Sequence, residues 1–276
     1  MTKDIERPDA VGRASSTAPR ISGNDLRIGY RADAAIIDGV DVEIPPGELT
    51  VIIGPNACGK STLLRSLARL LKPERGKVLL DATDIRSIPT KELARRLGLL
   101  PQTPIAPDGI TVQDLVSRGR YPHQSILRSW SAEDEVAVTQ ALTATETLDL
   151  AHRRVDELSG GQRQRVWIAM ALAQQTSVLL LDEPTTFLDI GHQNDVLELI
   201  SGMRGGERTI VAVLHDINQA SRFATHLIAM KDGSIIAEGS PRDIVTAELI
   251  HELFGLPARV IDDPVFGCPV VLPGVV

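Results

Sequence analysis

The sequence contains no apolar run near the length of about 18 residues that a membrane-spanning helix needs. It also lacks a basic excess, since 29 Lys and Arg residues stand against 36 Asp and Glu residues and the formal net charge is −7. A nucleic-acid-binding chain usually has a basic domain, so this balance argues against such a partner. Two cysteines, Cys58 and Cys268, are too few for a disulfide framework and fit a reducing compartment.

The first twenty residues also lack the apolar core of a secretory signal peptide. They are polar, of mixed charge, and contain Pro8 and Pro19, so we expect a disordered tail over residues 1–20. The rest of the 276-residue chain, of which 43% is hydrophobic overall, is long enough for one large or two modest domains.

Residues 54–62 match the pattern G-x-x-x-x-G-K-[ST], with an apolar strand-like run before them and a helix-like run over 63–71 after them. Such a loop curls so that backbone N–H groups and a helix N-terminus face a polyphosphate. Lys60 provides a charge for the β- and γ-phosphates, and the Ser61 hydroxyl is a ligand for Mg²⁺. The predicted nucleotide-binding residues of this loop are Gly54, Pro55, Asn56, Ala57, Cys58, Gly59, Lys60, Ser61 and Thr62.

The sequence Leu-Ser-Gly-Gly-Gln at 158–162 precedes a helix-compatible stretch at 163–173. Ser159 is a plausible N-cap for that helix, because a serine oxygen can accept from the free N–H groups of the first turn. The glycine pair exposes further N–H groups at the same helix start, which gives a second geometry suited to an anion.

Four apolar residues at 178–181 predict a strand that is buried on both faces of a parallel sheet. The strand ends in Asp182 and Glu183, which places both carboxylates at the sheet edge where open α/β folds bind ligands. There Asp182 can hold the Mg²⁺ shell, while Glu183 can orient and deprotonate an attacking water.

In these motifs the chain resembles the nucleotide-binding subunit of ABC transporters, from about residue 21 to the end. The resemblance implies an ATPase that uses ATP and Mg²⁺, with Walker A at 54–62 and the signature at 158–162. It assigns Mg²⁺ sensing and coupling to Gln102, Walker B to Asp182 and the catalytic carboxylate to Glu183. By the same resemblance, the signature residues that contact the partner's nucleotide are Ser159, Gly160, Gly161 and Gln162.

Three further assignments rest on the same resemblance. Leu188 and Asp189 match the D-loop, His215 matches the switch histidine at the γ-phosphate, and Tyr30 matches the aromatic that stacks on adenine. Each has a plainer alternative: Tyr30 as strand filling, His215 as a buried strand-end histidine, and Gln102 as a solvent-facing amide. The implied catalytic set is Glu183, His215 and Gln102, and the implied metal set is Ser61, Gln102 and Asp182.

The fold class predicted is α/β, a P-loop NTPase core of RecA-like type with an N-terminal antiparallel β layer over 22–53 and an inserted helical subdomain. The insert is expected at about 103–157, with helices over 110–116 and 132–142. The pair Asp232-Gly233 between two apolar runs predicts a hairpin. With the tail at 1–20 removed, residues 21–276 then form one ABC ATPase domain, whose C-terminal extension covers about 251–276.

The resemblance also implies partners. Two such subunits pack head to tail with each ATP between Walker A of one chain and the signature of the other, so a second ATP-binding subunit, identical or paralogous, is expected. The pair would act on a multi-span permease, contacted through residues 103–130, and through it serve an extracytoplasmic substrate-binding protein. The chain would then lie peripherally on the cytoplasmic face of the cell membrane, with no nucleic-acid partner.

The stretches 115–123 and 239–264 resemble the iron–siderophore importers of this family. We therefore expect a ferric siderophore as cargo, with cobalamin or haem as the alternative; a plainer interpretation makes Arg118 and Arg120 a solvated charge pair. A soluble ABC ATPase of translation or DNA repair and a cluster-assembly scaffold are the other candidate functions.

Cys58 is either a small filler or a thiol with a lowered pKa. The other histidines lack metal-ligand spacing.

Overall fold

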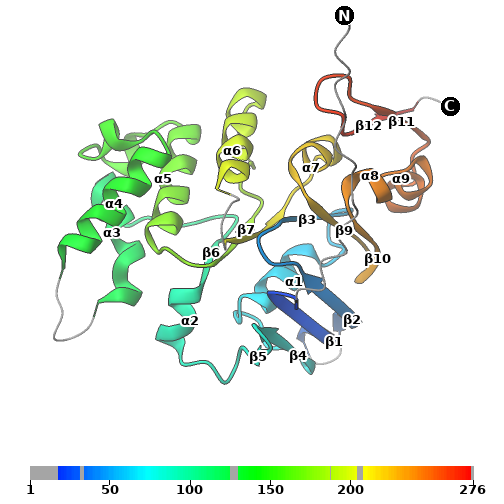
Figure 1. Cartoon of the computed structure of the whole chain (residues 1–276), viewed down its shortest axis with the longest axis horizontal. Helices are drawn as coiled ribbons and strands as arrows, with labels where there is room; N and C mark the ends of the chain where they lie inside the picture. Colours follow the sequence, from blue (N-terminus) through cyan, green and yellow to red (C-terminus); the bar gives the residue numbers. More distant parts are fainter. Residues whose placement is uncertain (1–17, 32–33, 125–129, 187, 204–207, 275–276) are drawn as a thin grey trace, which may run out of the picture.

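The structure, a computed structural model, describes residues 18–31, 34–124, 130–186, 188–203 and 208–274. Most of the predicted tail, residues 1–17, lies outside the described residues. Within them, no helix is both long and apolar enough to cross a membrane. Figure 1 shows the β layers near the middle, helices α3 to α5 gathered at one end and strands β11 and β12 at the other.

Four strands form an antiparallel layer in the order β2-β1-β4-β5. Strands β1 and β2 form most of the range 22–53 predicted for this layer, and they pair antiparallel from Ile21–Ile44 to Arg31–Ala34. Residues 49–53 of that range instead form β3, a parallel strand of the second sheet. Further along the chain, β4 pairs with β1 on its other edge. The strands are β1 Ile21–Arg31, β2 Ala34–Ile44, β4 Arg75–Leu80 and β5 Thr83–Asp84.

A second sheet has the order β10-β9-β3-β8-β7-β6 and is parallel except for its last pair, β9 and β10. The hairpin predicted at Asp232-Gly233 is confirmed, since it joins that antiparallel pair with both residues at positive φ, 46° and 77°. The strands are β3 Leu49–Ile53, β6 Leu97–Leu100, β7 Val178–Asp182, β8 Thr209–Val213, β9 His226–Lys231 and β10 Ser234–Gly239.

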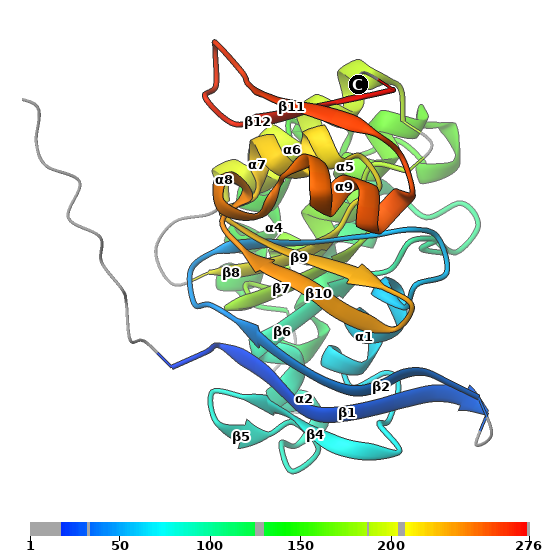
Figure 2. The same cartoon turned by 90° about the vertical axis from the view of Figure 1, so that its right-hand side faces the viewer.

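The central strands are mostly apolar because both faces of this sheet are covered. Alternate residues of β7 enter two different cores: Leu179 and Leu181 pack with the helices, whereas Val178 and Leu180 pack towards α1 and the antiparallel layer. Figure 2 shows this stacking, with the β1–β2–β4–β5 layer below the second sheet and α7, α8 and α9 above it. Every residue of β3, β7 and β8 is buried.

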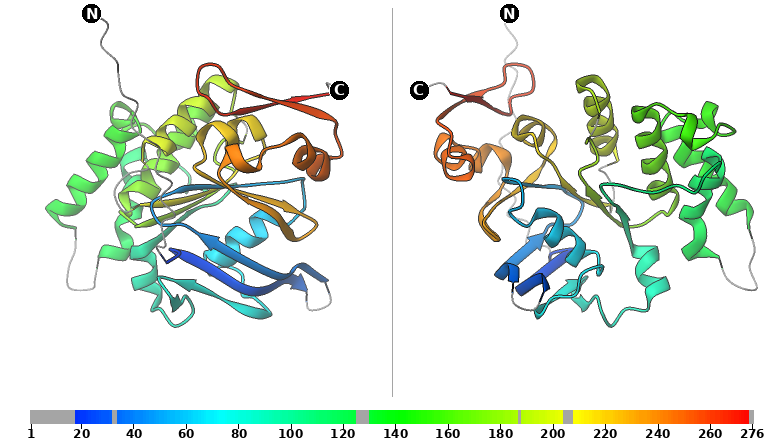
Figure 3. Two further views of the ribbon diagram at one scale, coloured as in Figure 1. Left: turned by 45° about the vertical axis from the view of Figure 1, so that its right-hand side comes forward. Right: turned by 180° about the vertical axis from the view of Figure 1, so that it is seen from behind.

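Most helices of the core connect successive strands of the second sheet. Two short helices flank strands of this sheet: α2 precedes β6, and α8 follows β10. Seen from behind and from the side in Figure 3, α3, α4 and α5 stay together away from α7 to α9. The helices are α1 Lys60–Leu67, α2 Thr90–Arg96, α3 Val112–Ser117, α4 Ala132–Ala144, α5 Gly160–Ala173, α6 Ile190–Gly202, α7 Ile217–Phe223, α8 Pro241–Ile244 and α9 Ala247–Phe254.

Helices α3 and α4 lie where the sequence predicts an insert, although its boundaries at 103 and 157 stay predictions. One expectation there is wrong: Arg118 is exposed, but Arg120 is buried with only 4% of its surface exposed. Its Nε donates to Asp134 Oδ1 at 2.8 Å, and one terminal nitrogen donates to the Ala173 carbonyl and the Gln175 amide oxygen, both at 2.8 Å. Arg120 therefore ties the segment after α3 to the start of α4 and the end of α5.

The chain after α9 forms a two-stranded antiparallel sheet, β11 Ala258–Asp262 and β12 Pro269–Pro273. The Asn218 side chain of α7 fixes it, because its amide nitrogen donates to the Val271 carbonyl at 3.1 Å and its amide oxygen accepts from Val271 N at 2.7 Å. Arg222, one turn further along α7, lies over the Phe266 ring at 3.9 Å.

The buried ion pair yields a stability prediction. Burial acts to raise the pKa of Asp134, but hydrogen bonds from Arg120 and Ser131 outweigh it and hold the pKa below the ordinary 3.8. The carboxylate's contribution is therefore complete above pH 3.8 and is lost as pH falls through the lower folded-state pKa. We expect Asp134→Asn to lower the unfolding free energy at neutral pH by about 3 kcal/mol, because it leaves the Arg120 charge uncompensated.

Denaturant unfolding of both proteins checks this expectation, and their difference should shrink at pH values below 3.8. The matched control is Asp156→Asn, which breaks the exposed Arg154–Asp156 pair and should cost less than about 1 kcal/mol. Equal effects of the two substitutions would contradict a structural role for the Arg120–Asp134 pair.

Candidate active site

The loop at 54–62 connects β3 to α1, as the sequence predicts. Gly54 has φ 150°, and a Cβ there would lie 2.0 Å from the Met230 carbonyl oxygen of β9, so only glycine allows this close approach. Gly59 precedes α1 in a left-handed conformation with φ 107° and no side-chain cap. The first N–H groups of α1 therefore remain available to an anion.

The Lys60 side chain is buried, with 5% exposed, and its ammonium folds back onto its own loop. Nζ donates to the carbonyl oxygens of Gly54 at 2.9 Å and Pro55 at 2.8 Å. No carboxylate is within ion-pair range of it among the described residues. The loop thus holds an uncompensated positive charge beside its backbone N–H groups, which is the electrostatic arrangement a polyphosphate requires.

A cavity of about 210 Å³ opens at this loop. It brings together residues that are far apart in the sequence, since Glu183 and His215 line it opposite the phosphate loop. Its full lining among the described residues is Ile36, Asn56, Ala57, Gly59, Lys60, Ser61, Thr62, Glu183 and His215.

Glu183 is the centre of the polar network at this cavity. Its Oε1 is 2.7 Å from His215 Nε2, and its Oε2 accepts from Gln102 Nε2 at 2.5 Å and from Thr186 Oγ1 at 3.0 Å. The residue has φ 52°, a left-handed conformation that is strained for a glutamate and turns the chain sharply after β7. The three predicted catalytic side chains, Glu183, His215 and Gln102, therefore meet at one carboxylate.

Asp182, the last residue of β7, is 1% exposed. Its Oδ1 accepts from the Ser61 hydroxyl at 2.7 Å, whereas its Oδ2 has no hydrogen-bond partner among the described residues. Burial raises the pKa of Asp182, with the Ser61 hydrogen bond and the Arg65 charge acting against it. A hydroxyl next to a carboxylate with a free oxygen fits Mg²⁺, which takes oxygen ligands from one or two carboxylates and from phosphates.

Two residues that the sequence motifs do not mark also belong to this site. Arg65 lies 3.7 Å from Asp182 Oδ2 and donates to the Tyr30 hydroxyl at 3.1 Å. Its signal is the spacing from Ser61, since residues four apart share one face of a helix. Thr186 is the second, and its signal is a position three residues after Glu183. Tyr30 itself is 56% exposed at the end of β1, so its stacking role stays a prediction.

The signature stretch caps α5, and the predicted N-cap at Ser159 is confirmed. Its hydroxyl accepts from Gln162 N at 3.3 Å, while the Gln162 side chain accepts from Ser159 N at 3.2 Å, which completes a capping box. Among the described residues that line the phosphate-loop cavity, none comes from 158–162. The phosphate loop and the signature stretch thus lie at separate places on the chain.

The signature loop contacts the start of α6 instead. A Cβ on Gly161 would lie 2.4 Å from the His192 ring, so a larger residue would displace that side chain. Asp189 caps α6 by accepting from His192 N at 2.9 Å, and this backbone hydrogen bond, with that from the His192 ring, lowers the pKa of Asp189. Phe187, in the segment before it, lies outside the described residues.

The structure distinguishes between the two alternatives for Cys58, a small filler or a thiol with a lowered pKa. Its thiol is buried and burial raises its pKa, while the Lys60 charge acts in the opposite direction and does not overcome it. The idea of a thiol activated by the helix N-terminus is therefore wrong, and Cys58 packs as a small filler beneath the loop. Elsewhere in the described part of the chain, no group of three or more His, Cys, Asp or Glu side chains could hold a metal ion.

Comparison with known proteins gives one consistent result. Residues 37–186 match the family model described as ABC transporter. The chain is 55% identical to the ferric enterobactin transport ATP-binding protein FepC of Escherichia coli K12, over 94% of this chain and 96% of that one. It is also 55% identical to a siderophore transport system ATP-binding protein, YusV of Bacillus subtilis 168, over 92% of both chains.

Among solved structures, the fold is similar to a chain of a metal-chelate type ABC transporter in an inward-facing conformation. The TM-score is 0.80 at 28% sequence identity, and the match covers 94% of this chain and 98% of that one.

The burial of Cys58 leads to a prediction about its reactivity. Because the thiolate is the nucleophile and burial disfavours it, we expect iodoacetamide to alkylate Cys58 at least about tenfold more slowly than the half-buried Cys268 at neutral pH. Mass spectrometry of digested samples taken over time measures both rates in one protein. Cys268→Ser provides the control, since it should leave the Cys58 rate unchanged. Faster labelling of Cys58 than of Cys268 would contradict the buried-filler interpretation.

Proposed function

This chain belongs to the ABC transporter family as an ATP-binding subunit, and from that premise we propose that it hydrolyses ATP to power the import of a ferric siderophore. The observation that carries the cargo is the 55% identity to FepC and to YusV across more than nine-tenths of each chain. FepC is named as a ferric enterobactin transport protein, and YusV as a probable siderophore transport system protein.

The hydrolytic mechanism follows from the cavity at the phosphate loop. Lys60 and the N-terminal N–H groups of α1 bind the β- and γ-phosphates. Glu183 then accepts a proton from the water that attacks the γ-phosphorus, while His215, 2.7 Å from its carboxylate, orients that carboxylate and reaches the γ-phosphate. Gln102 donates to the same carboxylate, so a movement of Gln102 would change how the Glu183 side chain is held.

Ser61 and Asp182 are the groups that would hold Mg²⁺. A bound Mg²⁺ would supply positive charge against the negative charge that develops during phosphoryl transfer. Ser61 Oγ and Asp182 Oδ1 are already 2.7 Å apart, and the second Asp182 oxygen has no hydrogen-bond partner among the described residues, which supports this assignment. Gln102 completes the proposed metal set as a sensor of the ion.

A second copy or a paralogous subunit supplies the other half of each site. One chain carries one phosphate loop and one signature loop, and the two lie apart, so a head-to-tail pair brings Ser159, Gly160 and Gly161 of one subunit to the nucleotide of the other. Asp189, at the start of α6 beside the signature loop, lies in the same interface. ATP then joins the two subunits, and its hydrolysis lets them separate.

The ATPase pair acts on a membrane permease, and the proposed contact is residues 103–130, of which 125–129 lie outside the described residues. The chain therefore binds the membrane peripherally from the cytoplasmic side, and an extracytoplasmic protein delivers the ferric siderophore to the permease. Gln102 directly precedes this contact surface and touches Glu183, so it connects the permease contact to the hydrolytic carboxylate.

The assignment of the general base makes one prediction. Glu183→Gln keeps a similar shape but cannot accept the proton, so we expect ATP binding within about threefold of wild type and turnover reduced by ~10²–10⁴-fold. Filter binding and phosphate release measure the two quantities, and size-exclusion chromatography should show an ATP-bound dimer. The exposed Glu252→Gln is the matched control and should hydrolyse normally. Turnover near the wild-type rate in Glu183→Gln would assign the base elsewhere.

The cargo makes a second prediction. A host strain that lacks this chain and has no redundant importer should lose uptake of iron-55 supplied as ferric enterobactin, while its uptake of labelled cobalamin should be unchanged. Expression of the wild-type chain should restore iron uptake, and Lys60→Ala should not, because it removes the phosphate-binding charge. Undiminished uptake of ferric siderophores in the deletion strain would reject the iron assignment and favour cobalamin or haem.

A further inference from the structure

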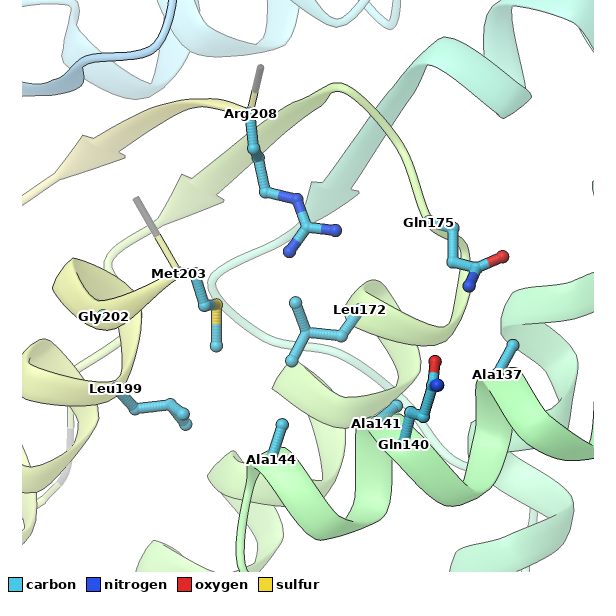
Figure 4. A pocket seen from close by; sticks show the side chains of 10 residues that line it. All are labelled: Ala137, Gln140, Ala141, Ala144, Leu172, Gln175, Leu199, Gly202, Met203 and Arg208. Carbon is cyan, nitrogen blue, oxygen red and sulfur yellow. The ribbon is translucent and has the colours of Figure 1, made fainter. Parts of the chain in front are cut away.

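A second and larger cavity, of about 480 Å³, lies where the helical insert meets the core. Its walls come from α4 and the end of α5 on one side and from the end of α6 and the residue before β8 on the other (Figure 4). None of its lining residues lines the phosphate-loop cavity. Its volume is within the range of about 300–1,000 Å³ typical of small-molecule sites.

The walls of this seam cavity are mainly apolar. Small alanines of α4 leave room in it, and larger side chains of α5 and α6 complete its walls. The apolar lining residues are Ala137, Ala141, Ala144, Leu172, Leu199 and Met203.

One cation enters this apolar space. Figure 4 shows the Arg208 guanidinium extending between Met203, Leu172 and Gln175. Only its Nε makes a hydrogen bond among the described residues, to the Thr176 carbonyl at 3.3 Å, and no described carboxylate pairs with it. The Arg208 side chain is half-buried, and this burial lowers its pKa. A half-buried guanidinium without a paired anion is unusual, because desolvated charges are normally paired.

The amide groups at the rim add donors. The Gln175 carbonyl oxygen accepts from Arg120, so the group that Gln175 retains for another partner is its NH₂ donor. Gln140 lines the cavity from α4. No aspartate or glutamate is among the described lining residues. The cavity therefore combines hydrogen-bond donors and one positive charge with walls that are mainly apolar.

We propose that the seam cavity is a second ligand site, separate from the nucleotide site, that binds a small monocarboxylate with an apolar tail. The carboxylate lies against the two terminal nitrogens of Arg208, which form a planar fork that matches a carboxylate in a bidentate geometry. The tail lies on Leu172, Leu199 and Met203.

The charge count selects a monoanion over a dianion. One guanidinium neutralises one negative charge, whereas a phosphate monoester would bring a second charge into an apolar space with no further cation among the described lining residues. A neutral molecule with the same tail would leave Arg208 unpaired. The carboxylate is thus the anion that both the charge and the fork geometry favour.

The place of this site gives it a regulatory consequence. A molecule held there touches α4 and α5, which carries the signature loop at its other end, and also α6 and the start of β8 in the core. It stabilises the particular arrangement of these elements in which the cavity exists, and a ligand that binds one arrangement better shifts the population towards it.

Octanoate is the probe, tested by isothermal titration calorimetry on the purified full chain. We expect saturable binding with a Kd below about 1 mM, a rise in melting temperature on addition of octanoate, and weaker binding of butyrate, 1-octanol and octyl phosphate. Arg208→Gln should weaken octanoate binding by about tenfold to hundredfold, because it removes a charge-assisted hydrogen-bond pair.

Two further variants separate ligand binding from folding. Ala144→Phe fills the cavity with an apolar ring from α4 and should weaken octanoate binding at least about tenfold without touching Arg208. The matched control is Arg259→Gln, an exposed arginine of β11, which should bind octanoate like wild type. Melting curves without ligand confirm that each variant is folded before its titration.

Three results would overturn the proposal. They are the absence of octanoate binding to the wild-type chain at millimolar concentration, equal binding by folded Arg208→Gln and wild type, and tighter binding of octyl phosphate or 1-octanol than of octanoate. None of these measurements depends on transport or on the cargo.

Discussion

The arrangement of the phosphate-loop cavity depends on one constraint, which is the register of the central parallel strands. Ile52 of β3 and Asp182 of β7 both pair with Val213 of β8, so the three strands end within one residue of the same row. The chain leaves that row as the phosphate loop after β3, as Glu183 after β7 and as the His215 segment after β8. The carboxyl ends of parallel strands meet at one edge, and here they bring Lys60, Glu183 and His215 to a single cavity. Asp182 lies beside it, hydrogen-bonded to Ser61. A slip of one strand by one residue would also exchange its two buried faces.

Local pattern predicts much of this arrangement. Gly54 and Gly59 mark backbone that only glycine adopts easily, four apolar residues before Asp182 mark a strand covered on both faces, and Asp232-Gly233 marks a hairpin. Each of these signals lies within a few residues of the feature it predicts. The roles of Gln102, His215 and Tyr30 came from the resemblance to a family, because a lone glutamine, histidine or tyrosine has no local pattern that distinguishes it.

The contacts that the sequence could not predict are those between distant segments. Arg120 looks like a surface residue in its own stretch and is buried only because α4 and the end of α5 close over it. Arg65 joins Tyr30 to Asp182 across two sheets. Asn218 substitutes for a neighbouring strand at Val271, 53 residues away. Cys58 has the sequence position of an activated thiol, yet burial governs its pKa. In each case the environment of the residue is set by tertiary packing, which a local sequence pattern does not predict.

Helix α5 joins two of these features end to end. Its first turn carries the capping box of the signature loop, and the carbonyl of its last residue, Ala173, is held by Arg120. Fourteen residues of α-helix form a rod of about 21 Å. Because the helix is held at its last residue, a small rotation there moves its first residue much further. A tilt of roughly 10° about the Arg120 contact would move the signature loop by about 4 Å, which is more than the length of a hydrogen bond. A small tilt of the helix is therefore enough to make or break a hydrogen bond at its far end.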